Sequence, residues 1–82
     1  MERIKVFALS TCPYCHQARK FLDDSGVDYD VVEVDKLSGA ERTEAIEEVK
    51  RLSGGTSFPV ITSGDTVVVG FDKAGISRLA GL

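Results

Sequence analysis

The sequence predicts an α/β fold of three layers, in which a four-stranded mixed sheet lies between three helices. Three observations predict it. Strand-like and helix-like segments alternate first, and a short hairpin pattern and one more helix follow them. The size also fits, because 82 residues with 43% hydrophobic and 28% charged side chains suffice for one small core. We therefore expect residues 1–82 to form a single domain.

The first half has the pattern of a strand–helix–strand unit. Residues 4–9 are nearly all apolar, as in a strand that is covered on both faces. A helix begins at Pro13, because proline suits the first helical turn, and ends at Gly26. Residues 27–35 form the second predicted strand. Its apolar residues alternate with polar ones, but the alternation shifts by one position after Val31, which indicates either a bulge or a strand that is partly covered on both faces. Such a unit places its two strands parallel.

The second half begins with a helix and continues with a hairpin. Ser38 and Glu41 have the spacing of a capping box at the start of that helix. Residues 58–62 and 66–69 form two short strands around a Ser-Gly-Asp turn, and Asp72 is a plausible N-cap for the last helix. The hairpin then adds an antiparallel half to the sheet that the first two strands begin.

Charge and hydropathy exclude several classes of partner. Ten Lys and Arg against thirteen Asp and Glu leave a net charge of -3, so there is no basic footprint for nucleic acid. No apolar run approaches the roughly 20 residues that cross a bilayer, so we expect no membrane partner. Residues 1–5 lead into a strand without the apolar stretch of a secretory signal, which favours a cytoplasmic location.

The chemistry of the chain is concentrated in Cys12-Pro13-Tyr14-Cys15. Cys12 falls where the first helix begins, so backbone N–H groups and the helix dipole should lower its pKa below the roughly 8.5 of a free thiol. Cys15 lies one turn further along, where burial should keep it protonated. It could then attack a mixed disulfide at Cys12 and release the substrate thiol. The spacing therefore predicts a complete dithiol redox cycle.

Other interpretations of these cysteines remain open. Both could be packing residues, since free cysteine is often buried, but a Cys-X-X-Cys beside a βαβ pattern is a specific redox signal. Cys12 to His16 also satisfies the pattern for c-type haem attachment. Against haem, the chain has a single histidine and offers only Met1 as a thioether for the opposite axial position. Zinc lacks four ligands, so we expect no metal. We interpret His16 as a solvated helix residue.

Three motifs together resemble the glutaredoxin family of the thioredoxin superfamily. They are the tetrapeptide from Cys12 to Cys15, Ser57-Phe58-Pro59 at the third strand, and Gly70-Phe71-Asp72 at the last helix. The resemblance covers nearly the whole chain in element order. It implies a thioredoxin-like fold with sheet order 2-1-3-4. It also implies that Cys12 attacks the substrate and Cys15 resolves the mixed disulfide.

The resemblance also implies a binding groove. Pro59 corresponds to the family's cis-proline, and Phe58 before it would offer its backbone N–H and C=O to an extended thiol peptide. Gly70, Phe71 and Asp72 correspond to the segment whose N–H groups hold the γ-glutamyl carboxylate of glutathione, the implied co-substrate. Tyr14 either borders the same groove or is a core aromatic residue.

Three departures from the family pattern leave the electron source open. Leu9 stands where many glutaredoxins have a basic residue, Val69 replaces the first of two glycines, and Lys73 replaces an acidic residue. Lys73 or Lys5 could compensate for the missing cation. The Gly-Phe start of the last helix is also similar to the glutaredoxin-like electron donors of ribonucleotide reductase, which thioredoxin reductase reduces.

We thus expect a monomeric oxidoreductase that reduces protein disulfides, glutathione mixed disulfides or both, with glutathione or a thioredoxin reductase as electron source. One alternative is the thioredoxin-reductase-coupled electron donor. A second alternative is non-enzymatic: two chains would share an iron–sulfur cluster through Cys12, with glutathione thiols as further ligands. Pro13 stiffens the loop and makes this cluster less favourable.

Overall fold

The computed structural model describes residues 3–82 and confirms the predicted α/β architecture. The elements follow in the order β1 (Ile4–Ala8), α1 (Pro13–Asp24), β2 (Tyr29–Glu33), the 3₁₀ turn η1 (Val34–Lys36), α2 (Gly39–Ser53), β3 (Val60–Ser63), β4 (Thr66–Val69) and α3 (Lys73–Ala80). Among these residues no helix is both long and apolar enough to cross a membrane.

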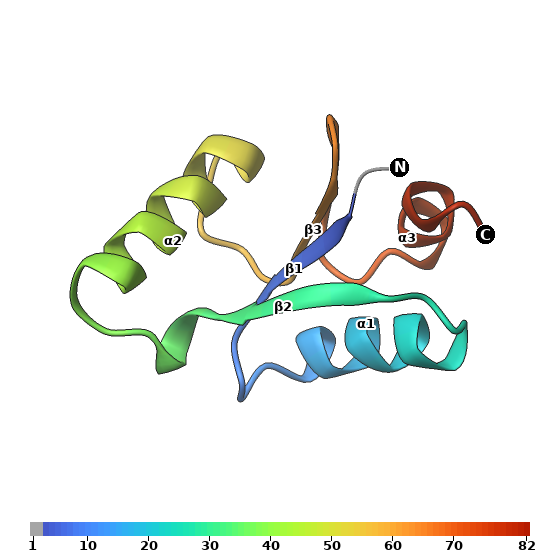
Figure 1. The fold of residues 1–82 in the computed structure, drawn as a ribbon, viewed down its shortest axis with the longest axis horizontal. Helices are drawn as coiled ribbons and strands as arrows, with labels where there is room; N and C mark the ends of the chain where they lie inside the picture. Colours follow the sequence, from blue (N-terminus) through green and yellow to red (C-terminus); the bar gives the residue numbers. More distant parts are fainter. Residues whose placement is uncertain (1–2) are drawn as a thin grey trace.

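The sheet has the order β2-β1-β3-β4, as the family resemblance implied. Strand β1 pairs in parallel with β2 and antiparallel with β3, and β4 completes the hairpin with β3. Helix α2 lies on one side of the sheet, whereas α1 and α3 lie on the other (Figure 1). The central position of β1 explains its apolar sequence, because both of its faces are covered.

The core consists of two clusters, one on each face of the sheet. Val6 and Ala8 of β1 point to the same face and pack with α1 and α3, whereas Phe7 between them packs with α2. This alternation follows from the two-residue period of a strand. The end of β1 is thereby fixed between two packed layers, and the segment that follows it carries Cys12.

The second strand is shorter than predicted. Only Tyr29–Glu33 pairs with β1, and its register runs unbroken from Ile4 opposite Tyr29 to Ala8 opposite Glu33, so the predicted bulge is absent. The alternative interpretation, partial cover on both sides, is confirmed: Tyr29 packs on the α1 face and Val32 on the α2 face. Val34 is buried, but by a 3₁₀ turn that leaves the sheet.

Two further expectations about element ends are wrong. The third strand begins at Val60 rather than at residue 58. Ser38 is the N-cap of α2, but its side chain makes no capping hydrogen bond, so the predicted capping box with Glu41 is not formed. At the other end, Gly54 closes α2 with a left-handed φ of 76°, which glycine adopts without steric cost.

Candidate active site

A hydrogen-bonded turn connects β1 to α1 and carries Cys12 to the helix start. The N–H of Cys12 donates to the carbonyl of Leu9 at 3.2 Å, which closes the turn. Cys12 is then the N-cap of α1, and Pro13 occupies the first helical position as predicted. No acidic side chain lies in the first turn of α1. The positive end of the helix therefore faces the Cys12 sulfur without a competing carboxylate from that turn.

The pKa of Cys12 lies below the ordinary thiol value. Burial acts to raise this pKa, but the backbone N–H of Cys15, the Cys15 thiol and the backbone N–H of Tyr14 donate hydrogen bonds to the sulfur and together outweigh it. Hydrogen bonds to the charged form favour ionisation. Cys12 is also only half-buried, so its thiolate is open to solvent.

Cys15 has the opposite character. Burial of its side chain, which is 1% exposed, is the main reason that its pKa rises to about 11. The hydrogen bond and negative charge of Cys12 raise it further, whereas the N–H of Leu9, 3.5 Å from the Cys15 sulfur, opposes the rise. When the pair loses its first proton, that proton therefore leaves Cys12, and the one that stays on Cys15 is donated to the Cys12 thiolate. The two thiols are free, so this is the reduced state.

The segment before β3 lies against the same core cluster as Cys12. The Phe58-Pro59 peptide bond is cis, as the resemblance implied. Phe58 and Cys12 are both half-buried and pack on the cluster beneath α1, and Phe71 joins them there. Residues from three distant parts of the sequence that the motifs singled out thus pack on one core cluster.

The start of α3 is tied to Pro59 by the backbone. Gly70, with a left-handed φ of 83°, donates its N–H to the Pro59 carbonyl at 2.8 Å. The N–H of Asp72 donates to the Gly70 carbonyl at 3.2 Å, and the Asp72 side chain caps α3 by accepting from Gly75. The cap is as predicted. However, two of the three N–H groups expected to hold a ligand carboxylate already have partners within the chain.

Tyr14 is not a core residue, which removes one of its two predicted roles. Its side chain is 61% exposed, between the two cysteines on the first turn of α1. The two lysines considered as substitutes for the missing cation lie in different parts of the fold. Lys5 lies over the ring of Phe7 and 3.9 Å from Glu48 of α2, on the opposite face of the sheet. Lys73 lies 6.0 Å from the ring of Phe21.

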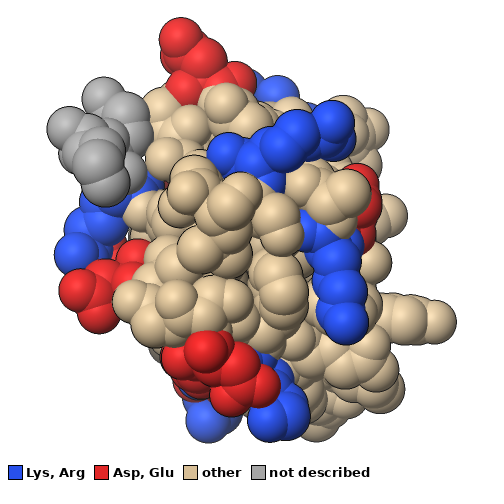
Figure 2. Space-filling view, turned by 90° about the vertical axis from the view of Figure 1, so that its right-hand side faces the viewer, with Lys and Arg blue, Asp and Glu red and all other residues tan. Residues whose placement is uncertain are grey.

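An open hollow of about 290 Å³ separates α1 from the start of α3. It is lined by Gln17, Lys20, Phe21, Asp24, Phe71 and Lys73. Figure 2 shows the side of the molecule on which α3 lies, where Lys and Arg are spaced around a broad uncharged centre and Asp and Glu lie at its edges. On this side of the molecule, positively and negatively charged side chains therefore surround a surface without charged residues.

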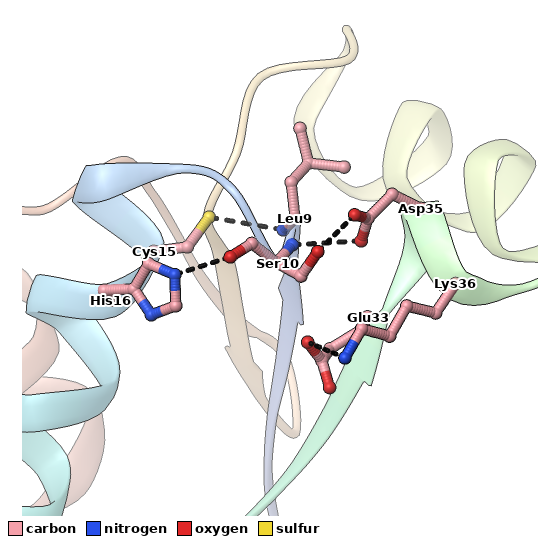
Figure 3. A network of polar contacts seen from close by, with 7 residues as sticks. All are labelled: Leu9, Ser10, Cys15, His16, Glu33, Asp35 and Lys36. Carbon is pink, nitrogen blue, oxygen red and sulfur yellow. Dashed lines mark hydrogen bonds and ion pairs between the residues drawn. The ribbon is translucent and has the colours of Figure 1, made fainter.

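Sequence reasoning missed a polar network beside the cysteines (Figure 3). The carboxylate of Asp35 accepts from the backbone N–H of Ser10 at 2.9 Å and also from the Ser10 hydroxyl. His16 Nε2 lies 2.6 Å from the Ser10 carbonyl, so this nitrogen carries the proton, because a carbonyl only accepts. His16 is exposed as predicted, but it also has this partner. The available signal was that Ser10 follows the first predicted strand and Asp35 ends the second, which is parallel to the first.

Comparison with known proteins assigns the family. The family model described as Glutaredoxin matches residues 4–68. The chain belongs to the glutaredoxin family. A glutaredoxin from Archaeoglobus fulgidus has a crystal structure that matches with a TM-score of 0.91 and 40% identity, over 96% of this chain and 86% of that one. The predicted thioredoxin-like fold is thereby confirmed, and the membership makes the chain a thiol oxidoreductase.

Two curated relatives extend the comparison within the glutaredoxin family. An uncharacterized glutaredoxin-like 8.6 kDa protein in the rubredoxin operon of Clostridium pasteurianum is 33% identical over 76 residues, which are 93% of this chain and 95% of that protein. The glutaredoxin-like protein NrdH of Escherichia coli is 30% identical over 77 residues, 94% of this chain and 88% of NrdH. The structure of NrdH-redoxin, described as the basis of its thioredoxin-like activity profile, matches with a TM-score of 0.76 over 94% of this chain and 93% of that one.

The described part of the chain holds no group of three or more His, Cys, Asp or Glu side chains placed to bind a metal ion. The zinc and haem patterns would both use Cys12, Cys15 and His16. In the structure the histidine has a different hydrogen-bond partner from the two cysteines. The two sulfurs hydrogen-bond to each other, whereas the His16 ring contacts the Ser10 carbonyl.

Proposed function

We propose that this chain is a dithiol thiol–disulfide oxidoreductase, in which Cys12 attacks a substrate disulfide and Cys15 resolves the mixed disulfide. One observation carries the proposal: hydrogen bonds at the start of α1 lower the pKa of Cys12, whereas burial, and then the hydrogen bond and charge of Cys12, raise the pKa of Cys15 to about 11. A thiolate is the attacking species in exchange, whereas a resolving thiol is best kept protonated until a mixed disulfide has formed.

The reaction balances in two exchange steps. The Cys12 thiolate forms a bond to one sulfur of the substrate disulfide, whose S–S bond breaks and whose leaving thiolate takes a proton from solvent. Cys15 then loses its proton and attacks the Cys12 sulfur, so that the Cys12–Cys15 disulfide forms and the second substrate thiol leaves. The substrate gains two electrons and two protons; the protein loses two electrons and the Cys15 proton, and the second proton comes from solvent, which received it when Cys12 ionised.

Selective alkylation tests the first step. Because only the thiolate reacts, the alkylation rate of each cysteine rises with pH as the pH passes through its pKa. We expect iodoacetamide to modify Cys12 with a midpoint below the ordinary pH of about 8.5, and Cys15 only near its pKa of about 11. Mass spectrometry of the peptides would measure both, with the denatured chain as control. Two cysteines that titrate together, or a Cys12 midpoint above about 8.5, contradict the proposal.

We further propose that a thiol peptide binds across Phe58, Pro59 and the start of α3. The packing of Phe58, Phe71 and Cys12 on one cluster supports this placement, as does the exposed ring of Tyr14 beside the cysteines. An extended peptide would exchange backbone hydrogen bonds with Phe58, as in strand addition. Protein disulfides, in a cytoplasmic setting, are the substrates that such a groove fits.

A second candidate function is an electron donor that a thioredoxin reductase reduces in preference to glutathione. The specific observation is that Gly70 and Asp72 already use their N–H groups within the chain. Leu9 also supplies no cation beside the cysteines, and Lys5 lies over the Phe7 ring and 3.9 Å from Glu48, on the opposite face of the sheet. Each missing charge-assisted contact weakens the hold on a glutathione carboxylate. The similarity to NrdH supports the same candidate.

A comparison of reductants tests this second candidate. We expect NADPH with a thioredoxin reductase to reduce the oxidised protein about tenfold faster than glutathione with glutathione reductase, because one lost charged contact costs about that factor. NADPH absorbance would report both rates. Leu9→Lys restores a cation three positions before Cys12 and should raise the glutathione rate selectively. If glutathione is the faster reductant of the unaltered protein, this second candidate is wrong.

A further inference from the structure

The ends of β1 and β2 bring Ser10 and Asp35 together. Ala8 and Glu33 are partners in the parallel pairing of the two strands, and Ser10 and Asp35 follow them by the same two residues. Parallel strands end at the same edge of a sheet, so equal steps beyond the last pair lead to neighbouring positions. The contact between the Asp35 carboxylate and Ser10 is therefore a consequence of the register.

Asp35 supplies an acceptor that the turn itself lacks. In the turn from Leu9 to Cys12, the carbonyl of Leu9 accepts from Cys12 and closes the ring. Ser10 is the first of the two central residues, whose N–H points out of the turn. Asp35 accepts from this N–H at 2.9 Å and from the Ser10 hydroxyl, so both donors of one residue contact one carboxylate (Figure 3).

The orientation of Ser10 determines which backbone groups lie near Cys15 and its helical neighbour His16. The peptide N–H immediately before Ser10, that of Leu9, lies 3.5 Å from the Cys15 sulfur. On the other side, the Ser10 carbonyl accepts from His16, the residue that follows Cys15 in α1. Asp35 from the η1 turn therefore holds a segment that contacts Cys15 on one side and its helical neighbour on the other.

We propose that Asp35 is a positioning residue for the resolving step, which holds Ser10 so that the Leu9 N–H is directed at the sulfur of Cys15. This inference rests on the dithiol function proposed above. In that step Cys15 gives its proton to solvent, its sulfur bonds to Cys12, and the Cys12–substrate bond breaks with loss of the substrate thiolate. A donor aimed at Cys15 stabilises the negative charge that develops there.

The charge of Asp35 persists over the pH range in which the protein would work. The hydroxyl and N–H of Ser10 hold the pKa of this carboxyl below its usual value, and Lys36 beside it acts in the same direction. Glu33, two positions before Asp35, has its carboxylate 3.5 Å from Lys36 and is paired with that lysine rather than with Ser10. Glu33 therefore offers a matched control for the loss of a charge at this edge.

Single-turnover kinetics separate the two steps of exchange. A nitrobenzoate disulfide releases one coloured thiolate when Cys12 attacks it and a second when Cys15 resolves the mixed disulfide, so stopped-flow absorbance resolves two phases. We expect Asp35→Ala to slow the second phase about tenfold, the order of one hydrogen bond to a charged group, and to change the first less than about twofold. The pH midpoint of the second phase should rise. Glu33→Gln should leave both phases unchanged.

Two further variants separate positioning from charge and from folding. Asp35→Asn keeps an oxygen that accepts from the Ser10 N–H and should recover most of the lost rate. Ser10→Ala removes only the hydroxyl contact and should slow the second phase about threefold, the order of one neutral hydrogen bond. If Asp35→Ala does not fold, the Ser10→Ala variant tests the same inference.

Several outcomes would overturn the inference. They are a second phase in Asp35→Ala within about twofold of the unaltered rate, an Asp35→Asn variant as slow as Asp35→Ala, or an equal slowing of both phases. If Asp35→Ala does not fold, an unaltered rate in Ser10→Ala has the same meaning. If the unaltered protein itself shows no second phase, the dithiol function fails, and the role of Asp35 fails with it.

Discussion

Replacing Cys12 by serine is expected to lower turnover at least about a thousandfold with every disulfide substrate. A hydroxyl at this position ionises far less readily than a thiol and cannot form a mixed disulfide, so the first exchange step is lost. The backbone donors of Cys15 and Tyr14 that lower the pKa of Cys12 have no comparable effect on an alcohol. Reduction of a protein disulfide and of a glutathione mixed disulfide, each followed by NADPH consumption, would measure the loss.

Cys15→Ser is the matched control for this substitution, because it removes the same atom one turn further along α1. With a glutathione mixed disulfide, a second thiol from solution can resolve Cys12, so this variant should retain activity. With a protein disulfide the mixed disulfide should accumulate and turnover should stop. An active Cys12→Ser variant would refute the nucleophilic role of Cys12. Equal losses in both variants with both substrates would favour the thioredoxin-reductase-coupled donor.

The layers of the fold could be predicted because hydrophobic periodicity reports which faces are covered. The apolar run of β1 indicated burial on both faces, and Val6 and Phe7 are indeed buried in different clusters. The end of β2 could not be predicted in the same way. Val34 is buried in either a strand or a 3₁₀ turn, so an apolar pattern alone does not distinguish them.

The cysteines could be identified from the sequence because their chemistry depends on local features. The spacing from Cys12 to Cys15 and the position of Pro13 are enough to place one thiol at a helix start and the other inside it. The contacts of Ser10 and Gly70 depend on distant segments instead. Asp35 reaches Ser10 only through the register of β1 with β2, and Pro59 reaches Gly70 only through the hairpin. No short motif contains that information.

Helix α1 holds the two cysteines in place through a narrow buried stripe. Cys15, Ala18 and Leu22 follow one another at helical spacing and are each no more than 1% exposed. The stripe packs on Val6, Ala8 and Ile61 of the sheet in the same cluster. The rest of α1 is exposed or half-buried, so the packing that orients Cys15 depends on very few side chains.

Leu22→Ala is therefore expected to destabilise the protein by about 3 kcal/mol, through lost burial and the cavity that remains. This is a large part of the roughly 5–15 kcal/mol that separates folded from unfolded domains. Equilibrium unfolding in urea would measure it as a lower midpoint with an unchanged slope. Leu82→Ala is the control, because Leu82 is 58% exposed and the same substitution there should change stability by less than about 0.5 kcal/mol. Equal effects of the two substitutions would show that α1 is not held by this stripe, and the position of Cys15 would then need another explanation.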